Sequence, residues 1–214
     1  MDNCIFINNT ATGSGGGIQW TGANGTITDS RFTNNKATNY FGGGVRWIGA
    51  NGTIIDSIFN NNFAGQDGGG VFWEGTGVNG CLINCTFTNN SANRNAGGVY
   101  WQRIKGTISG CTFKGNIAVA AGGGICWDGA DCTLTNSFFI NNTAGAGGGV
   151  RWSGANGNLS NCNFTNNTST NYGGGGVCWS GANGFIINSN FINNIAKGVI
   201  GGGGVYWSVV LIVL

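Results

Sequence analysis

The amino-acid sequence predicts an all-β fold, a parallel β-helix of about eight coils that forms a single domain over residues 1–214. Two periodic columns carry this prediction. Tryptophan recurs along the whole chain at intervals of 25 to 28 residues, at positions 20, 47, 73, 101, 127, 152, 179 and 207. Eight phenylalanines, at positions 6, 32, 59, 87, 113, 139, 164 and 191, are each followed by asparagine three residues later. Repeats of this length are the sequence signature of solenoid folds.

The composition indicates a packed chain with few charges. Although 44 residues are glycine, 41% are hydrophobic, including eight tryptophans and thirteen phenylalanines, which is too much apolar surface for a disordered chain. The net charge of +2 predicts no basic surface for nucleic acid. Because histidine is absent, neither a histidine-based catalytic triad nor a histidine metal site is expected.

The first strand of each repeat follows a run of glycines and reads Val or Ile, one variable residue, then Trp. On a strand the first and third residues share a face, so we expect Val or Ile and Trp to point into the coil and the variable residue to point outward. The turn that follows reads Gly-Ala-Asn-Gly in four coils, and Asn-Gly favours positive φ. The outward column comprises Gln19, Arg46, Phe72, Tyr100, Cys126, Arg151, Cys178 and Tyr206.

The second strand carries an inward Ile or Leu, as at Ile27 and Leu82. The third strand carries Ser or Cys and, two residues later, the Phe of the Phe-x-x-Asn motif. These residues lie an odd number of positions after the Ile or Leu, so on one straight strand they would point to the opposite face. A bend is therefore expected between these two strands, at an Asp or Asn column that includes Asp29 and Asn84. Three short strands per coil account for about 27 residues. An Ala column and a stretch of variable length lead back to the glycines.

Coils of this kind bury their inner face only by stacking in register, each strand pairing with its equivalent one coil away. The columns then become ladders of Trp, Phe, Ile or Leu, and Asn, and the Asn amides can hydrogen-bond along the axis. Helical repeats are disfavoured by the low helix propensity of Gly-rich and Asn-rich segments. A propeller would need four strands and about 40 residues per blade.

The pairing of Gly-Gly-x-(Ile/Val) with Phe-x-x-Asn resembles the repeats of chlamydial polymorphic outer membrane proteins. Residues 159–167, LSNCNFTNN, are similar to the repeat regions of adhesin-like surface proteins of methanogenic archaea and some bacteria. The resemblance implies an extracellular right-handed β-helix that serves in surface display, adhesion or envelope structure. The Trp in every coil departs from the chlamydial motif, which has no fixed residue there.

The two ends of the chain share one phase of the repeat. Met1, five residues before Phe6, and Leu214, seven residues after Trp207, both fall in the phase of the inward Ile or Leu column. Two interpretations stay open: end-to-end self-association into filaments, or a fragment of a longer array. No apolar run of about 18 residues predicts a membrane span, and the start lacks the pattern of a secretion signal.

The cysteines follow the columns. Cys85 and Cys111 are neighbours in adjacent coils of the inward Ser/Cys column, where the spacing permits a disulfide, but free buried thiols are the favoured interpretation. Cys126 and Cys178 are expected in the outward column. Because the chain has no Cys-x-x-Cys pair and no His, no metal and no cofactor is predicted. The inward column contains Cys4, Cys85, Cys111 and Cys162.

A carbohydrate-active enzyme is the competing class, because β-helix enzymes use clustered carboxylates with a basic partner or a cation. The chain offers two such groups, Asp29 with Asp56 and Arg31, and Glu74 with Asp128 and Arg103. Each is too sparse to predict catalysis, so solvated surface charges are the favoured interpretation and no catalytic residue is assigned.

The variable stretch before the glycines is where such scaffolds place binding residues. Tyr40 and Tyr172 could stack on sugars, but they lie five coils apart, roughly 24 Å, so one small ligand cannot touch both. Ordinary turn residues are therefore the favoured interpretation of this stretch. Asn-x-Ser/Thr sequons, as at Asn24 and Asn51, would permit glycosylation of a secreted protein.

We therefore predict a non-enzymatic, extracellular structural or adhesin-like protein at the cell surface. Its expected partners are further copies of itself, end to end, and a cell-surface or glycan partner. The alternative is a carbohydrate-binding or polysaccharide-degrading β-helix.

Overall fold

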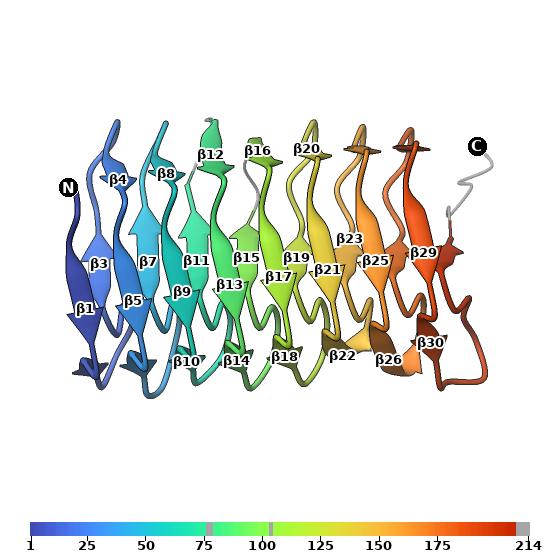
Figure 1. The fold of residues 1–214 in the computed structure, drawn as a ribbon, viewed down its shortest axis with the longest axis horizontal. Coiled ribbons are helices and arrows are strands. Elements are labelled where there is room, and N and C mark those ends of the chain that lie inside the picture. Colours follow the sequence, from blue (N-terminus) through green and yellow to red (C-terminus); the bar gives the residue numbers. More distant parts are fainter. Residues whose placement is uncertain (76–78, 103–104, 209–214) are drawn as a thin grey trace, which may run out of the picture.

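The computed structural model is a rod of parallel strands that wind around one long axis (Figure 1). It describes residues 1–75, 79–102 and 105–208. Within these ranges the regular elements are all β-strands, 31 in number, and they form four parallel sheets. Each sheet takes one strand from successive coils, so the prediction of a parallel β-helix with about eight coils is confirmed.

The sheets are named here after the inward residue that recurs in each. The Phe sheet contains β1 (Ile5–Ile7), β5 (Arg31–Thr33), β9 (Ile58–Asn60), β13 (Thr86–Thr88), β17 (Thr112–Lys114), β21 (Phe138–Ile140), β25 (Asn163–Thr165) and β29 (Asn190–Ile192). The Ala sheet contains β2 (Thr10–Ala11), β6 (Lys36–Ala37), β10 (Phe63–Ala64), β14 (Ser91–Ala92), β18 (Ile117–Ala118), β22 (Thr143–Ala146), β26 (Thr168–Tyr172) and β30 (Ile195–Ala196).

The other two sheets complete each coil in chain order. The Trp sheet contains β3 (Ile18–Trp20), β7 (Val45–Ile48), β11 (Val71–Glu74), β15 (Val99–Gln102), β19 (Ile125–Trp127), β23 (Val150–Trp152), β27 (Val177–Trp179) and β31 (Val205–Trp207). The Ile/Leu sheet contains β4 (Thr26–Thr28), β8 (Thr53–Ile55), β12 (Gly80–Ile83), β16 (Gly106–Ser109), β20 (Thr133–Thr135), β24 (Asn158–Ser160) and β28 (Phe185–Ile187).

The prediction of three strands per coil is wrong, because the coils have four. The missed strands are those of the Ala sheet, most of which are only two residues long. A second corner separates them from the Phe sheet: Asn34 has φ +54° and Asn61 has φ +54°. Asparagine tolerates this left-handed conformation, so the chain turns sharply between two strands that the sequence pattern had merged.

The predicted bend before the Phe sheet is confirmed by its backbone geometry. Asp29 has φ +46° and Asn84 has φ +53°, which turns the chain from the Ile/Leu sheet into the Phe sheet. The Asn of the Gly-Ala-Asn-Gly turn is also left-handed, with φ +57° at Asn24. These corners therefore use Asp or Asn, or glycine as at Gly110, all of which can adopt this conformation at low cost.

The core consists of aromatic stacks that run along the axis. Neighbouring Phe rings of the Phe sheet lie 4.6–4.9 Å apart with planes within 6° of parallel. Trp rings lie 4.5–5.2 Å apart. All inward Val, Ile or Leu, Phe and Trp side chains between Ile27 and Trp179 are buried. The predicted facing of these columns is confirmed.

A ladder of asparagines closes the corner between the Phe and Ala sheets. Each side-chain Nδ2 donates to the Oδ1 of the next asparagine at 2.9–3.0 Å, from Asn9 through to Asn194. The amide hydrogen bonds predicted along the axis are therefore present, and they satisfy polar groups that the stacking of coils buries.

Glycine precedes the Ile/Leu strands because the Trp ring lies against it. A Cβ at Gly106 would overlap the indole of Trp101. Cys132 occupies the same column one coil later, since Thr107 pairs with Thr133. At that coil the Trp127 ring is tilted by 33° from Trp101, more than in any other described Trp pair, which is what a side chain in the glycine position should cause.

Candidate functional site

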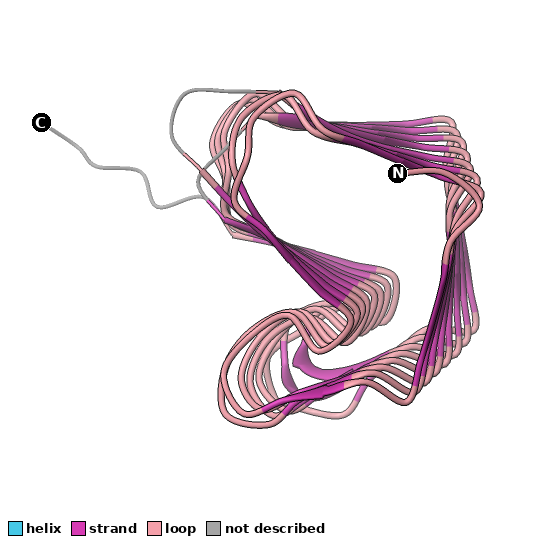
Figure 2. Cartoon of the chain, turned by 90° about the vertical axis from the view of Figure 1, so that its left-hand side faces the viewer, coloured by secondary structure: helices cyan, strands magenta, loops and turns pink. Residues whose placement is uncertain are grey.

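The chain between the Ala and Trp sheets folds outward into a lobe beside the main coil, which Figure 2 shows in cross-section. This lobe, made of the segments that join the two sheets, packs on the outer surface of the Trp sheet. Phe72, Tyr100 and Cys126 point out of the main coil as predicted, yet they are buried under the lobe together with Ala96. The outward positions of these three coils are therefore covered by the lobe, whereas Gln19 in the first coil is exposed.

One carboxylate anchors the lobe. Asp67 is 1% exposed. It accepts hydrogen bonds from Nε of Arg94 at 2.9 Å, from Nη2 of Arg94, and from the backbone N–H of Asn95 at 2.9 Å. These hydrogen bonds compensate for the removal of the carboxylate from water, because a buried carboxylate without partners would be strongly unfavourable.

A column of residues at the base of the lobe determines where the lobe is hollow. Its members immediately precede the glycine runs, except Asn95, which precedes Ala96. Short backbone pairings join Asn95 to Ala121 and Ala121 to Ala146. Tyr172 follows, paired with Ala146 across a register shift in β26. Two alanines thus lie between two larger side chains. The connection 145–149 is also two residues shorter than the connection 170–176, which narrows the lobe at that coil.

The hollow is a cavity of about 350 Å³, called the lobe cavity below. Asn95 lies at one side and Asn171 and Tyr172 at the other, with Ala120 and Ala121 between them. The Trp sheet supplies the rest of the lining, which comprises Cys126, Asp128, Arg151 and Ser153. The residues thus come from four successive coils, and no single repeat could form the site.

The charged groups of the lobe cavity are held in place by neighbouring coils. Asp128 accepts hydrogen bonds from the Tyr100 hydroxyl at 2.5 Å and from the Ser153 hydroxyl at 2.9 Å. Arg151 donates through Nη1 to the Trp152 carbonyl at 3.0 Å and to the Ser180 hydroxyl at 2.9 Å. Burial first, and then the hydrogen bond to Asp128, raises the pKa of Tyr100, so its hydroxyl stays a donor.

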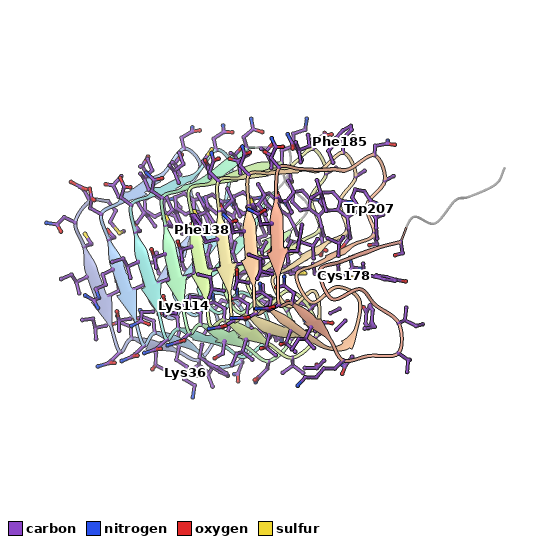
Figure 3. All side chains as sticks on the ribbon, turned by 45° about the vertical axis from the view of Figure 1, so that its right-hand side comes forward. Lys36, Lys114, Phe138, Cys178, Phe185 and Trp207 are labelled. Carbon is purple, nitrogen blue, oxygen red and sulfur yellow. The ribbon has the colours of Figure 1, made fainter. Side chains whose placement is uncertain are left out.

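Two thiols flank Arg151 on the outer face of the Trp sheet. Burial raises the pKa of Cys126, which the Asp128 carboxylate reinforces and the Arg151 guanidinium opposes. Burial also raises the pKa of Cys178, again opposed by Arg151. Figure 3 labels Cys178 close to the lobe. Both thiols are therefore protonated at neutral pH and are poor nucleophiles.

Of the two tyrosines considered for sugar stacking, only Tyr172 lines the lobe cavity. Tyr172 is 48% exposed and Tyr40 is 50% exposed. They lie in separate coils, as expected, so they do not form one site.

The carboxylates considered for catalysis are not assembled into a centre. Asp29 and Asp56 are exposed at the corner between the Ile/Leu and Phe sheets, while Arg31 donates to Thr33 on the outer face of β5. Glu74 pairs with Arg46 through a 2.5 Å contact, two coils from Asp128. Arg103 lies outside the described residues.

Cys85 and Cys111 are free thiols, as the favoured interpretation predicted. Cys85, Cys111 and Cys162 are fully buried in the inward column. Within residues 1–75, 79–102 and 105–208, no three His, Cys, Asp or Glu side chains converge as metal ligands. The same ranges contain no helix long and apolar enough to cross a membrane.

Sequence reasoning singled out the loops that border the lobe cavity, but it did not assign Asn95, Asn171, Arg151 or Ser153 to one site. One feature of the sequence could have indicated the cavity: Ala121 and Ala146 occupy a column that elsewhere holds larger residues, such as Phe41 and Asp67. That column becomes visible only when the pairings of the lobe are known.

A family model described as a right handed beta helix region matches residues 1–139, more than half of the chain. No curated protein and no solved structure matches the chain. The match extends over the first coils of the rod and defines the hand of the solenoid as right-handed.

Proposed function

We propose that this chain, which belongs to the right-handed β-helix family, is a non-enzymatic structural or adhesin-like element that acts outside the cell. The observation that carries the proposal is the unbroken set of Phe, Trp and Asn ladders along the described rod. Such ladders make a stiff scaffold whose outer faces are free to vary.

The extracellular placement is supported by the surface of the rod. Threonine, serine and asparagine occupy most outward positions of the Ile/Leu sheet, and the sequon residues Asn24 and Asn51 are exposed. The resemblance of the repeat to chlamydial polymorphic outer membrane proteins and to adhesin-like proteins supports the same placement. The separation of the Asp29 and Glu74 groups described above supports a non-enzymatic role.

End-to-end self-association is the second part of the proposal. The aromatic columns reach both ends of the described rod: Phe6 and Trp20 are only half-buried in the first coil, and Trp207 is 39% exposed in the last (Figure 3). Stacking one copy on the next would continue the same ladders. Such a contact is heterologous and does not close, so it would produce filaments.

Electron microscopy over a range of protein concentrations tests self-association. We expect filaments with a subunit repeat of about 38 Å, eight coils at the strand spacing of about 4.8 Å. Trp207→Arg should suppress them, whereas Phe138→Arg, an exposed aromatic on the side of the rod, should not. Dispersed short rods at every concentration would contradict self-association and leave the scaffold role in place.

A carbohydrate-binding role is the alternative that a specific observation favours. The lobe cavity combines an exposed tyrosine ring with amide, hydroxyl, carboxylate and guanidinium groups. This mixture of aromatic and polar groups is typical of binding sites for small polar ligands. Binding and scaffolding are compatible, because an adhesin-like rod needs a contact site on its surface.

A further inference from the structure

We propose that the lobe cavity binds one neutral hexopyranose unit of a glycan. This inference rests on the adhesin-like role proposed above and gives it a contact site. The shape of the lobe cavity fits one sugar unit. Asn95 and Tyr172 are three coils apart, roughly 14 Å along the axis at the strand spacing, and only alanines occupy their column between them. A volume of about 350 Å³ lies within the range of small-molecule sites.

The charge of the lobe cavity favours a neutral ligand. The lobe cavity contains one carboxylate, Asp128, and one guanidinium, Arg151, so its formal charge is zero. A ligand with a net charge would leave one of these groups facing a like charge. A neutral ligand rich in hydroxyl groups uses both, because hydroxyls donate to the carboxylate and accept from the guanidinium.

The polar groups of the lobe cavity have unused hydrogen-bonding capacity. Each Asp128 oxygen accepts one hydroxyl hydrogen bond and can accept another. In the described part of the chain, Arg151 donates only through Nη1, and its Nε and Nη2 have no protein acceptor. The side chains of Asn95 and Asn171 add donors and acceptors at the rim. Asp128 and Arg151 are held by hydrogen bonds to neighbouring coils, so little ordering of these two groups is needed on binding.

The half-exposed ring of Tyr172 offers a surface on which a sugar can stack. A register shift in β26 places this residue opposite Ala146, where the neighbouring side chain is small. Bulges of this kind re-aim side chains. A pyranose presents an apolar C–H face that packs on an aromatic ring, while its hydroxyls point sideways toward polar groups such as those of the cavity floor.

Isothermal titration calorimetry of the full chain tests the proposal. The ligands are the methyl glycosides of glucose, galactose and mannose, with glucuronic acid and glucosamine as charged comparators. We expect saturable binding of at least one neutral glycoside and weaker binding of both charged sugars. Tyr172→Ala should weaken binding about tenfold. Tyr40→Ala is the matched control, because Tyr40 is equally exposed but lies five coils away, and it should bind like the wild type.

Asn171→Ala provides a second variant at the rim, and circular dichroism checks that each variant is folded. The proposal is overturned if no neutral glycoside binds, if a charged sugar binds more tightly, or if Tyr172→Ala and Asn171→Ala both bind like Tyr40→Ala. Failure here leaves filament formation untouched, since microscopy measures that separately. Loss of filaments in turn leaves sugar binding by the single rod intact.

Discussion

A single ladder asparagine joins three coils. The Asn116 side chain donates to the Phe87 carbonyl at 2.9 Å and to Oδ1 of Asn142 at 3.0 Å. Its Oδ1 accepts from both the backbone N–H and the side-chain Nδ2 of Asn90 at 3.0 Å. Because all of these groups are buried, each bond is one that water cannot replace.

Replacing Asn116 with alanine should therefore lower the free energy of unfolding by about 3 kcal/mol, because the Asn90 amide and the Phe87 carbonyl each lose a hydrogen-bond partner while they stay buried. Urea denaturation followed by circular dichroism measures the change. Asn60→Ala is the control, because Asn60 lies on the outer face of β9 and takes no part in the ladder; its effect should be within about 0.5 kcal/mol. An equal decrease in the free energy of unfolding in the two variants would contradict a stabilising role of the asparagine ladder.

The inward Ser/Cys column links stability to alkaline pH. Burial raises the pKa of Cys162 from 9.0 to about 11. A thiol whose pKa is raised on folding contributes stability that is fully present below the unfolded pKa and is lost as pH rises toward the folded pKa. For Cys162 that window runs from pH 9.0 to about 11.

Cys162→Ser should remove this part of the alkaline sensitivity, because serine does not titrate and already occupies the column at Ser57 and Ser137. Urea midpoints at pH 8, 9, 10 and 11 should show the wild type losing on the order of 2 kcal/mol more than the variant between pH 9 and 11. Parallel pH curves for the two proteins would contradict the shift.

At the scale of elements, the lobe is the part of the coil that varies. The four sheets repeat in every described coil, whereas the segments between the Ala and Trp sheets differ in length and side chains. They are nevertheless ordered by their own small core, with Phe72 and Tyr100, and by the Asp67 carboxylate. The lobe therefore forms a second, smaller stack of coils along the side of the main solenoid.

Asp67→Asn should loosen the lobe without unfolding the rod. The variant keeps the shape of the side chain but loses the charge that holds Arg94, so we expect a loss of about 2 kcal/mol. Hydrogen exchange should quicken at the amides of residues 93–97. Asp131→Asn is the matched control: its partner Lys105 lies 3.0 Å away in an exposed pair, and no measurable change is expected. Unchanged exchange in Asp67→Asn would contradict the anchoring role.

At the scale of the whole molecule, stability is carried by contacts between neighbouring coils. Every strand pairing in the described rod is parallel and joins equivalent strands of successive coils, as in Thr26 with Thr53. A solenoid of this kind is a sum of repeats and interfaces. Removing one whole coil should therefore preserve the fold, whereas removing part of a coil should not.

Deleting residues 26–52, which joins Gly25 directly to Thr53, removes one coil and keeps the register. We expect a folded rod shortened by about 4.8 Å in small-angle scattering. Deleting residues 26–39 instead removes β4, β5 and β6, so that β3 and β7 of the Trp sheet follow one another without the three strands that complete the coil between them. This deletion should give an aggregated or unfolded chain. Equal folding of the two deletions would contradict the repeat-based account.

The structure agreed with the sequence wherever an inward column was involved. Trp101 and Phe113, for example, could be placed because a buried column tolerates few residue types, and so its period is visible. The Ala strands were missed because two residues with one small inward side chain give no period-two signal. The lobe cavity was missed because it is created by the small side chains of Ala121 and Ala146, and a space left by small side chains produces no recognisable sequence motif.

The sequence by itself determined the repeat, the parallel stacking and the identity of every axial ladder, because these follow from side-chain period alone. Only the tertiary structure decided that a fourth sheet exists, that the outer face of the Trp sheet is covered, and that Asp128, Arg151 and Tyr172 share one cavity. These three residues belong to different coils. Their side chains line one cavity because of the combined lengths of the loops in adjacent coils, and the sequence of a single repeat does not contain that information.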